Sequence, residues 1–229
     1  MSSTIYKDTS VLNKVKPANN WPVITVLFLL LAIPGIPAIF IVSNVLIGLA
    51  ANEMPLELVN TIYLSRPWAV IIHGISGVLF FISAPMQFSP ALRSKYLKLH
   101  KYSGYLVFVS GYIMALSAVW MHHTLTPNDL GPRYIGLVIM AFAMCLCFSM
   151  ALKHIIQKNV PAHQAWVIRA MAVTLGAITY LFIEITFILT LGQIDGFKPL
   201  ILELLHNYGR IVAVAVNLLI AQRLITRVC

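Results

Sequence analysis

The sequence predicts an all-α integral membrane protein in which six helices cross the bilayer. The 229 residues are 59% hydrophobic and 10% charged, with a mean hydropathy of +0.86, whereas an ordinary soluble domain carries about 25% charged residues. A spanning helix needs roughly 20 apolar residues. Four windows of about this length or longer contain no Asp, Glu, Lys or Arg: they separate Lys16 from Glu53, Arg66 from Arg93, Lys101 from Asp129, and Arg133 from Lys153.

Six spans follow from these windows and from two further apolar stretches that carry charges. The predicted spans are residues 21–45, 68–88, 101–121, 134–152, 165–191 and 200–223. Residues 34–37 hold two prolines and are expected to kink the first span. Spans two to five are expected to form a four-helix core flanked by spans one and six. Residues 1–20 are expected to be a cytoplasmic tail, and residues 21–229 a single transmembrane domain.

The basic residues are segregated to one side of the predicted membrane. The outer segments hold only Arg66, Arg133 and Lys198. The inner segments hold Lys7, Lys14, Lys16, Arg93, Lys95, Lys98, Lys101, Lys153, Lys158, Arg223 and Arg227. This asymmetry predicts that both termini are cytoplasmic, and the four tryptophans fall at predicted span ends, where aromatic belts form. The net charge of +9 is therefore explained by topology, and nucleic-acid binding is not expected.

Three histidines are predicted at the inner ends of three different spans. They are His100, His154 and His163, with Arg169 six residues further along the fifth span, or roughly 9 Å deeper. Neutral imidazole is the usual axial ligand of haem b. We expect His100 and His163 to clamp a haem, with His154 as a weaker candidate and Arg169 positioned to neutralise a propionate. The alternative is that these side chains face lipid headgroups.

A second group of polar residues is predicted near the outer face. His73 lies roughly 7 Å inside the second span, and Glu184 lies at the outer end of the fifth. Glu203, His206 and Arg210 share one face of the sixth span. Functional interpretations are a second haem held by His73 and His206, or a quinone or proton site that uses Glu184. The alternative is a salt-bridge network, with Glu203 paired to Arg210, that anchors the sixth span.

Other polar residues carry weaker signals. His122 and His123 follow the third span and are expected to serve the outer loop. Asn217 and Gln87 are candidates for hydrogen bonds between helices. The sequence contains no phosphate-binding glycine loop, HExxH motif or nucleophile elbow. Any chemistry is therefore expected to depend on a bound cofactor or on proton-relay groups.

Several short motifs stand at the predicted span ends. They are His73, the run Ala84-Pro85-Met86-Gln87-Phe88, Arg93, the stretch His100 to Gly104, and His163-x-x-Trp166-x-x-Arg169. Together they resemble a family of predicted bacterial membrane proteins, domain of unknown function 2306, over about residues 65–225. That family has been likened to transmembrane b-type cytochromes and ferric reductases, whose four-helix core holds one or two haems.

The resemblance implies that His73, His100 and His163 are more important than His154 and His206. His73 has no histidine partner in the fourth or fifth span. An outer haem therefore needs His206 or the loop after the third span as its second ligand, and a protein with one haem or none remains an alternative.

The resulting hypothesis is a b-type cytochrome-like electron-transfer protein or oxidoreductase of the bacterial inner membrane. It would bind one or two haems and take electrons from quinol or a partner reductase. A second class is a cofactor-free, proton-linked transporter or small-molecule binder that uses Glu184, Arg210 and His73. A third is an accessory subunit of a larger membrane complex, with a homodimer as another form of assembly.

Overall fold

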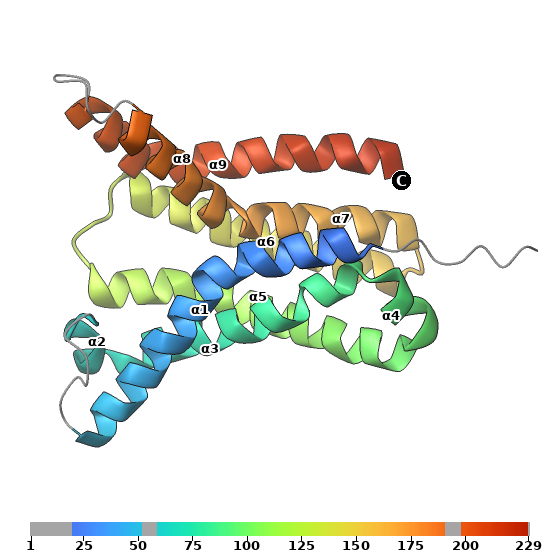
Figure 1. Ribbon diagram of the computed structural model, residues 1–229, viewed down its shortest axis with the longest axis horizontal. Helices are drawn as coiled ribbons and strands as arrows, with labels where there is room; N and C mark the ends of the chain where they lie inside the picture. The colour runs from blue at the N-terminus through green and yellow to red at the C-terminus, as the bar shows by residue number, and fades with distance from the viewer. Residues whose placement is uncertain (1–19, 52–58, 191–197, 229) are drawn as a thin grey trace, which may run out of the picture.

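The computed structural model of the protein describes residues 20–51, 59–190 and 198–228, most of them helical (Figure 1). The helices are α1 (Trp21–Ala51), α2 (Ile62–Ser65), α3 (Pro67–Ser83), η1 (Pro85–Phe88), α4 (Pro90–Lys95), α5 (Leu97–Leu125), α6 (Pro132–Ile156), α7 (Val160–Thr174), α8 (Gly176–Thr190) and α9 (Lys198–Val228). In these described ranges six segments are long and apolar enough to cross a membrane: α1, α3 with η1, α5, α6, α7 with α8, and α9. The predicted all-α fold with six spans is confirmed.

The spans expose large apolar side chains, which require lipid around them. Leu29, Phe142 and Leu189 are examples, each more than 60% exposed. Side chains of this kind in contact with water would form patches that soluble proteins avoid. Each observed span overlaps its predicted range and begins earlier or ends later. The predicted tail, residues 1–20, lies outside the described residues apart from Asn20.

Four helices form the core of the bundle. α5 packs between α3 and α6, and α6 packs between α5 and α7. Phe148 on α6 lies at the centre, where its ring contacts those of Phe80, Phe108 and Tyr112 at centroid distances of 6.1, 5.5 and 5.8 Å. α1 flanks this core along α3, and α9 flanks it along α6 and α7. The predicted arrangement of four core helices and two flanking helices is therefore observed.

α1 contains Pro34 and Pro37 within the helix and changes direction near its middle (Figure 1). Each proline removes a backbone donor and interferes with the preceding turn, which explains the predicted kink. Near this kink a Cβ at Gly35 would lie 2.8 Å from the ring of Phe81. Glycine at this position therefore lets α1 approach α3 closely.

The fifth span is broken, which the sequence analysis did not predict. α7 ends at Thr174 and α8 begins at Gly176, and α8 leaves the line of α7 (Figure 1). A helix end leaves backbone carbonyls without partners, and lipid cannot supply any. Asn217 of α9 donates from Nδ2 to the carbonyl of Ala172 (3.1 Å) and accepts from the hydroxyl of Thr179 (3.0 Å). Asn217 thus bridges the break, which confirms that it bonds between helices.

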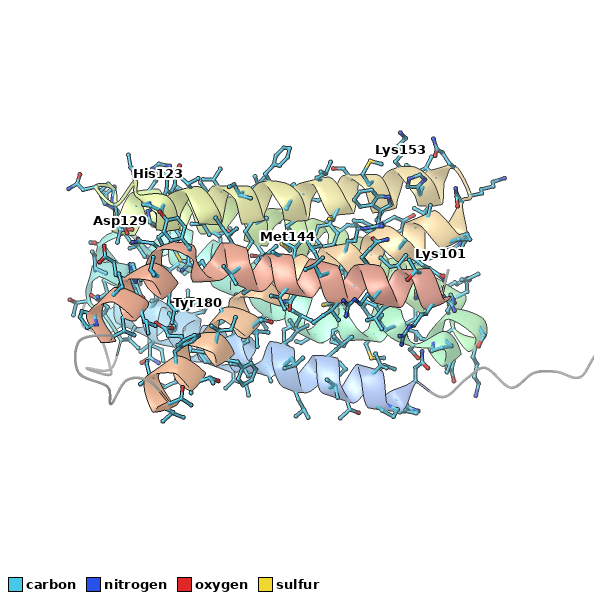
Figure 2. The ribbon with its side chains drawn as sticks, turned by 90° about the horizontal axis from the view of Figure 1, so that it is seen from above. Lys101, His123, Asp129, Met144, Lys153 and Tyr180 are labelled. Atoms are coloured by element: carbon cyan, nitrogen blue, oxygen red, sulfur yellow. The ribbon has the colours of Figure 1, made fainter. Side chains whose placement is uncertain are left out.

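The alternating helices collect the basic side chains at one end of the bundle. Figure 2 shows Lys101 and Lys153 at this end and His123 and Asp129 at the other. We call the first the basic end and the second the opposite end. The basic end is defined by Arg93, Lys95, Lys98, Lys101, Lys153, Lys158, Arg223 and Arg227.

Candidate functional site

A short turn between α6 and α7 brings two histidines to the basic end. Lys158 has a φ of 60°, a left-handed conformation that reverses the chain after α6. Asn159 then donates its backbone N–H to the carbonyl of His154 (2.9 Å), and its side chain accepts from the N–H of Ala162 (3.2 Å). This side-chain cap begins α7 and places His163 one turn inside it.

His163 is held by the neighbouring helix. Its Nδ1 lies 2.9 Å from the carbonyl oxygen of Ala151 on α6. A carbonyl only accepts, so Nδ1 carries the proton and Nε2 keeps its lone pair. Histidines that bind metals commonly donate the other ring N–H to a carbonyl in this way, which fixes the ring and its tautomer. The ring of His163 is therefore held in place, with Nε2 as its acceptor nitrogen.

His100 and His154 differ from His163, because the Nδ1 atom of each has no hydrogen-bond partner. Both Nδ1 atoms are buried and make no hydrogen bond within the described part of the chain. A buried polar group left without a partner costs about 1–3 kcal/mol. His100 also lies close enough to His163 to interact with it electrostatically. The structure thus brings the predicted pair to one end of the bundle, on α5 and α7.

The basic end does not contain a bare metal site built from side chains. Among the described residues no group of three or more His, Cys, Asp or Glu could hold a metal ion. Structural and catalytic metal sites usually take three or four protein ligands. Two imidazoles suit a metal whose other ligands come from a cofactor, as in haem. Among the described residues the side chains of the basic end therefore do not complete a metal site by themselves.

Arg169 lies deeper in α7, but it is engaged with α9. Its Nη2 donates to the side-chain oxygen of Gln222 (2.8 Å), and its guanidinium stacks over Trp166 at 4.7 Å from the ring centroid. A guanidinium has five N–H donors, so these contacts leave others unused. The contacts observed assign Arg169 to the packing of α7 against α9.

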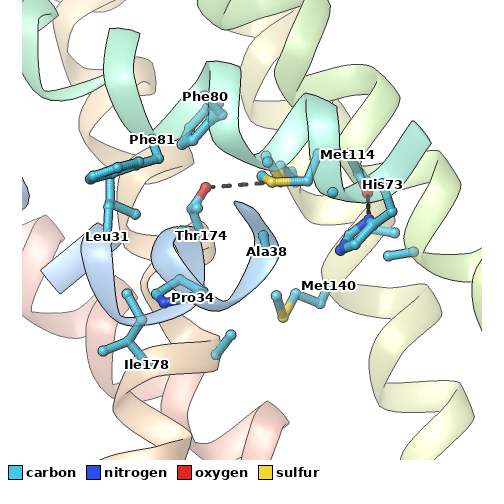
Figure 3. Close-up of a pocket in the computed structure, with 18 of the residues that line it drawn as sticks. Leu31, Pro34, Ala38, His73, Phe80, Phe81, Met114, Met140, Thr174 and Ile178 are labelled. Atoms are coloured by element: carbon cyan, nitrogen blue, oxygen red, sulfur yellow. Dashed lines mark hydrogen bonds between the residues drawn. The ribbon is translucent and has the colours of Figure 1, made fainter. Parts of the chain in front are cut away.

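His73 lies in the other half of the bundle, beside an apolar cavity of about 190 Å³ (Figure 3). Its Nδ1 is 3.1 Å from the carbonyl of Met114 and 3.1 Å from the hydroxyl of Ser117, both on α5. A cavity of about 150 Å³ is known to accept benzene in another protein, so this one accommodates a single substituted ring. It is too small for the four pyrrole rings of a haem.

His206 and His73 are bonded to different helices, α6 and α5 respectively. His206 is exposed on α9 and accepts a hydrogen bond at Nε2 from Arg133 of α6 (3.1 Å). Among the described residues His73 and His206 make no direct contact with each other. The pairing considered for an outer haem stays a prediction.

The other predicted outer residues form a loose polar network. Arg210 lies close enough to Arg133, Tyr180 and Glu184 to interact with them electrostatically. Tyr180 lies close to Glu184, which is one turn further along α8. Within the described part of the chain Glu203 makes no ion pair, so its predicted direct pairing with Arg210 is not observed. The network links α6, α8 and α9.

His122 and His123 fasten the connection between α5 and α6. Nε2 of His122 is 2.6 Å from the carbonyl of Asp129, and Nε2 of His123 is 2.6 Å from the hydroxyl of Tyr134. Both rings also contact the ring of Tyr134, at centroid distances of 5.0 Å. The predicted role of this pair in the outer loop agrees with these bonds.

Sequence reasoning missed the groups that orient the histidines. The carbonyls of Ala151 and Met114 carry no side-chain signal, because any residue supplies a carbonyl. Ser117 could have been found, since a hydroxyl within an apolar span needs a bonding partner. Thr174, which lines the cavity beside His73, could have been noticed for the same reason.

These features define an integral membrane protein of six helical spans, with histidines near both ends of the bundle. The chain belongs to the family described as predicted membrane protein (DUF2306), whose model matches residues 70–225. The resemblance inferred from the motifs is confirmed, and the matched range contains all seven histidines. No curated protein and no solved structure matches the chain.

Proposed function

We propose that this protein is a b-type cytochrome-like electron carrier that binds one haem through His100 and His163 at its basic end. The proposal rests on the buried, unpartnered Nδ1 of His100 near a second imidazole that is already oriented by a carbonyl. A metal bound at Nδ1 of His100 would remove the cost of that unpartnered atom. A bis-histidine haem is coordinatively saturated and suits single-electron transfer.

The chain's own residues supply the scaffold for this site. The carbonyl of Ala151 holds the Nδ1 proton of His163 and so keeps Nε2 available as a ligand. Gln87 donates to the hydroxyl of Ser103 at 2.7 Å, which ties η1 to the first turns of α5 beside His100. This bond between helices fulfils the expectation for Gln87. It fixes the start of α5, and therefore the position of His100.

We place the basic end in the cytoplasm, and the protein in a bacterial inner membrane, because of the positive-inside rule. The haem would then lie near the cytoplasmic face and would exchange electrons with a partner protein or a lipid-soluble donor. Alkaline phosphatase fused to the C-terminus should be inactive, while a fluorescent protein fused there should fold. An active phosphatase fusion would reverse this orientation.

An optical spectrum tests the haem. The full-length protein, expressed with ample haem precursor and purified in detergent, should show a Soret band that shifts when dithionite is added. His100→Ala and His163→Ala should each lose this band. His122→Ala is the matched control, because His122 lies at the other end of the same helix as His100 and should retain it.

Two results would contradict the proposal. Wild-type protein without a Soret band would remove the haem altogether. Loss of the band in His154→Ala with retention in His100→Ala would move the ligand from α5 to α6.

A further inference from the structure

The cavity beside His73 has walls that suit a flat ring. Small side chains on three helices, among them Gly77, Ala115 and Ala141, leave the space open, and Met140 and Met144 border it. Methionine thioethers adapt to irregular surfaces and make favourable contacts with aromatic rings. A volume of about 190 Å³ corresponds to one substituted six-membered ring.

The hydrogen bonds of His73 determine what its free nitrogen recognises. The Met114 carbonyl beside Nδ1 only accepts, and the Ser117 hydroxyl donates to the same carbonyl (3.2 Å). Nδ1 must therefore carry the proton of the neutral ring, and Nε2 is a hydrogen-bond acceptor. Figure 3 shows this second nitrogen on the cavity side of the ring. Nε2 has no partner within the described part of the chain, so it is available to a ligand that donates.

Thr174 is the other polar side chain that lines the cavity, and it is also an acceptor. Its single hydroxyl proton has two acceptors, the carbonyl of Ala170 at 2.9 Å and the sulfur of Met144 at 3.8 Å. In both bonds the hydroxyl donates, so its oxygen can still accept. His73 and Thr174 lie apart from each other around the cavity in Figure 3. The cavity thus presents two acceptors in apolar surroundings, and a ring with two hydroxyl groups complements them. A ring dione, which only accepts, finds no side-chain donor there.

The cavity reaches the lipid-facing surface of the bundle. Pro34 on α1 and Ala177 on α8 both line it, and both are exposed. α1 and α8 belong to spans that lie in the membrane. A ligand can therefore enter from the bilayer, and its hydrocarbon tail can remain there while the ring occupies the cavity.

We infer that this cavity binds the ring of a lipid-soluble hydroquinone, with one hydroxyl donating to Nε2 of His73 and the other to Thr174. In its role as the electron donor this ligand rests on the proposed function. Its binding alone does not depend on haem. The lipid-soluble donor would then bind in the half of the bundle away from the basic end, with Phe80 and Phe148 between the two sites.

Equilibrium dialysis of full-length protein in detergent, without oxygen, tests the inference with 2,3,5-trimethylhydroquinone as the probe. The wild type should bind it, and His73→Phe should bind it at least roughly tenfold more weakly, because the hydroxyl then loses a buried partner. The dimethyl ether of the same compound has the same ring but cannot donate, and it should bind wild type at least roughly tenfold more weakly as well.

Two further variants test whether the probe binds in the cavity or elsewhere on the protein. Ala141→Phe fills the space but leaves His73 in place, and it should abolish binding. His122→Phe changes a histidine outside the cavity and should bind the probe as wild type does. Near-ultraviolet circular dichroism confirms that each variant is folded.

Equal binding of the hydroquinone and its ether would overturn the inference and make the cavity an unselective apolar space for lipid or detergent tails. Unchanged binding by His73→Phe would also overturn it. The Soret band of His73→Phe should match that of wild type; its loss would make His73 a haem ligand. Wild type that binds the probe but has no Soret band would refute the haem and leave this site standing.

Discussion

The histidines at the two ends of the bundle differ in how their ring nitrogens are satisfied. At the basic end, His100 and His154 each bury an Nδ1 without a partner in the described structure. At the opposite end, His122, His123 and His206 are each bonded to a neighbouring residue. Both groups lie at span ends and look alike in the sequence. Position at a span end therefore does not determine whether a histidine finds a hydrogen-bond partner, and the histidines left with a buried unpartnered nitrogen are the ones whose environment needs a further explanation.

The strongest test of this difference is the haem content of variants at each end. His163→Ala at the basic end should lose essentially all bound haem, because it removes a ligand whose ring is held in place. His206→Ala at the opposite end should keep it. The haem per protein, measured from the reduced spectrum, gives both values. Equal losses would mean that the two ends are not functionally distinct.

Asn217 lies between the two ends, and its removal should have the next largest effect. Asn217→Leu leaves the Ala172 carbonyl and the Thr179 hydroxyl without partners at the break in the fifth span, which should cost about 1–2 kcal/mol of stability. Asn44→Leu is the matched control, since within the described residues the amide of Asn44 bonds to the carbonyl of Phe40 on its own helix (2.8 Å) and to no other helix. Denaturation in detergent should show the larger loss for Asn217→Leu, and the reverse order would contradict the assigned role.

His154→Phe should have a smaller effect of the opposite sign. An apolar ring replaces an imidazole whose Nδ1 is buried without a partner, so the variant should be more stable by about 1 kcal/mol. His123→Phe at the opposite end removes a bond to the hydroxyl of Tyr134 and should lose up to about 0.5 kcal/mol, because the site is exposed. Thermal midpoints of both variants in one detergent decide between these signs.

The smallest effect is expected for Glu184→Gln. Glutamine keeps the size and polarity of the side chain beside Tyr180, so stability should change by less than about 0.5 kcal/mol. The Soret band should also remain, because Glu184 lies at the end away from His100 and His163. A proton-linked transporter would need this carboxyl. A wild type that transports a substrate and contains no haem, with transport lost in Glu184→Gln, would therefore place the functional site at the opposite end.

The fold was largely predictable because charge-free windows and basic loops report directly on what lipid excludes. The break in the fifth span was not predictable from those rules. A single glycine such as Gly176 is common in membrane helices, and the residue that stabilises the break, Asn217, lies in another span. Its role depends on how α9 packs against α7, which hydropathy does not encode.

The candidate sites were predictable in part, for a related reason. Side-chain chemistry and helical rise placed His100 and His163 at one level, and the structure brings them to one end. The same reasoning grouped His73 with His206, because it measured depth and not direction around the bundle. The neighbours of a helix decide that direction, and α3 turns His73 toward α5 rather than α9.

The matched family range begins at residue 70, so α1 lies outside it although its Leu31, Pro34 and Ala38 line the cavity beside His73. A relative built only from the matched range would keep every histidine but would have this cavity open to lipid along one whole side. Changes in α1 can therefore alter which ring is admitted without moving any imidazole. Under the two proposals made above, ligand preference and electron-carrying capacity would be encoded in separate stretches of the chain and would diverge independently.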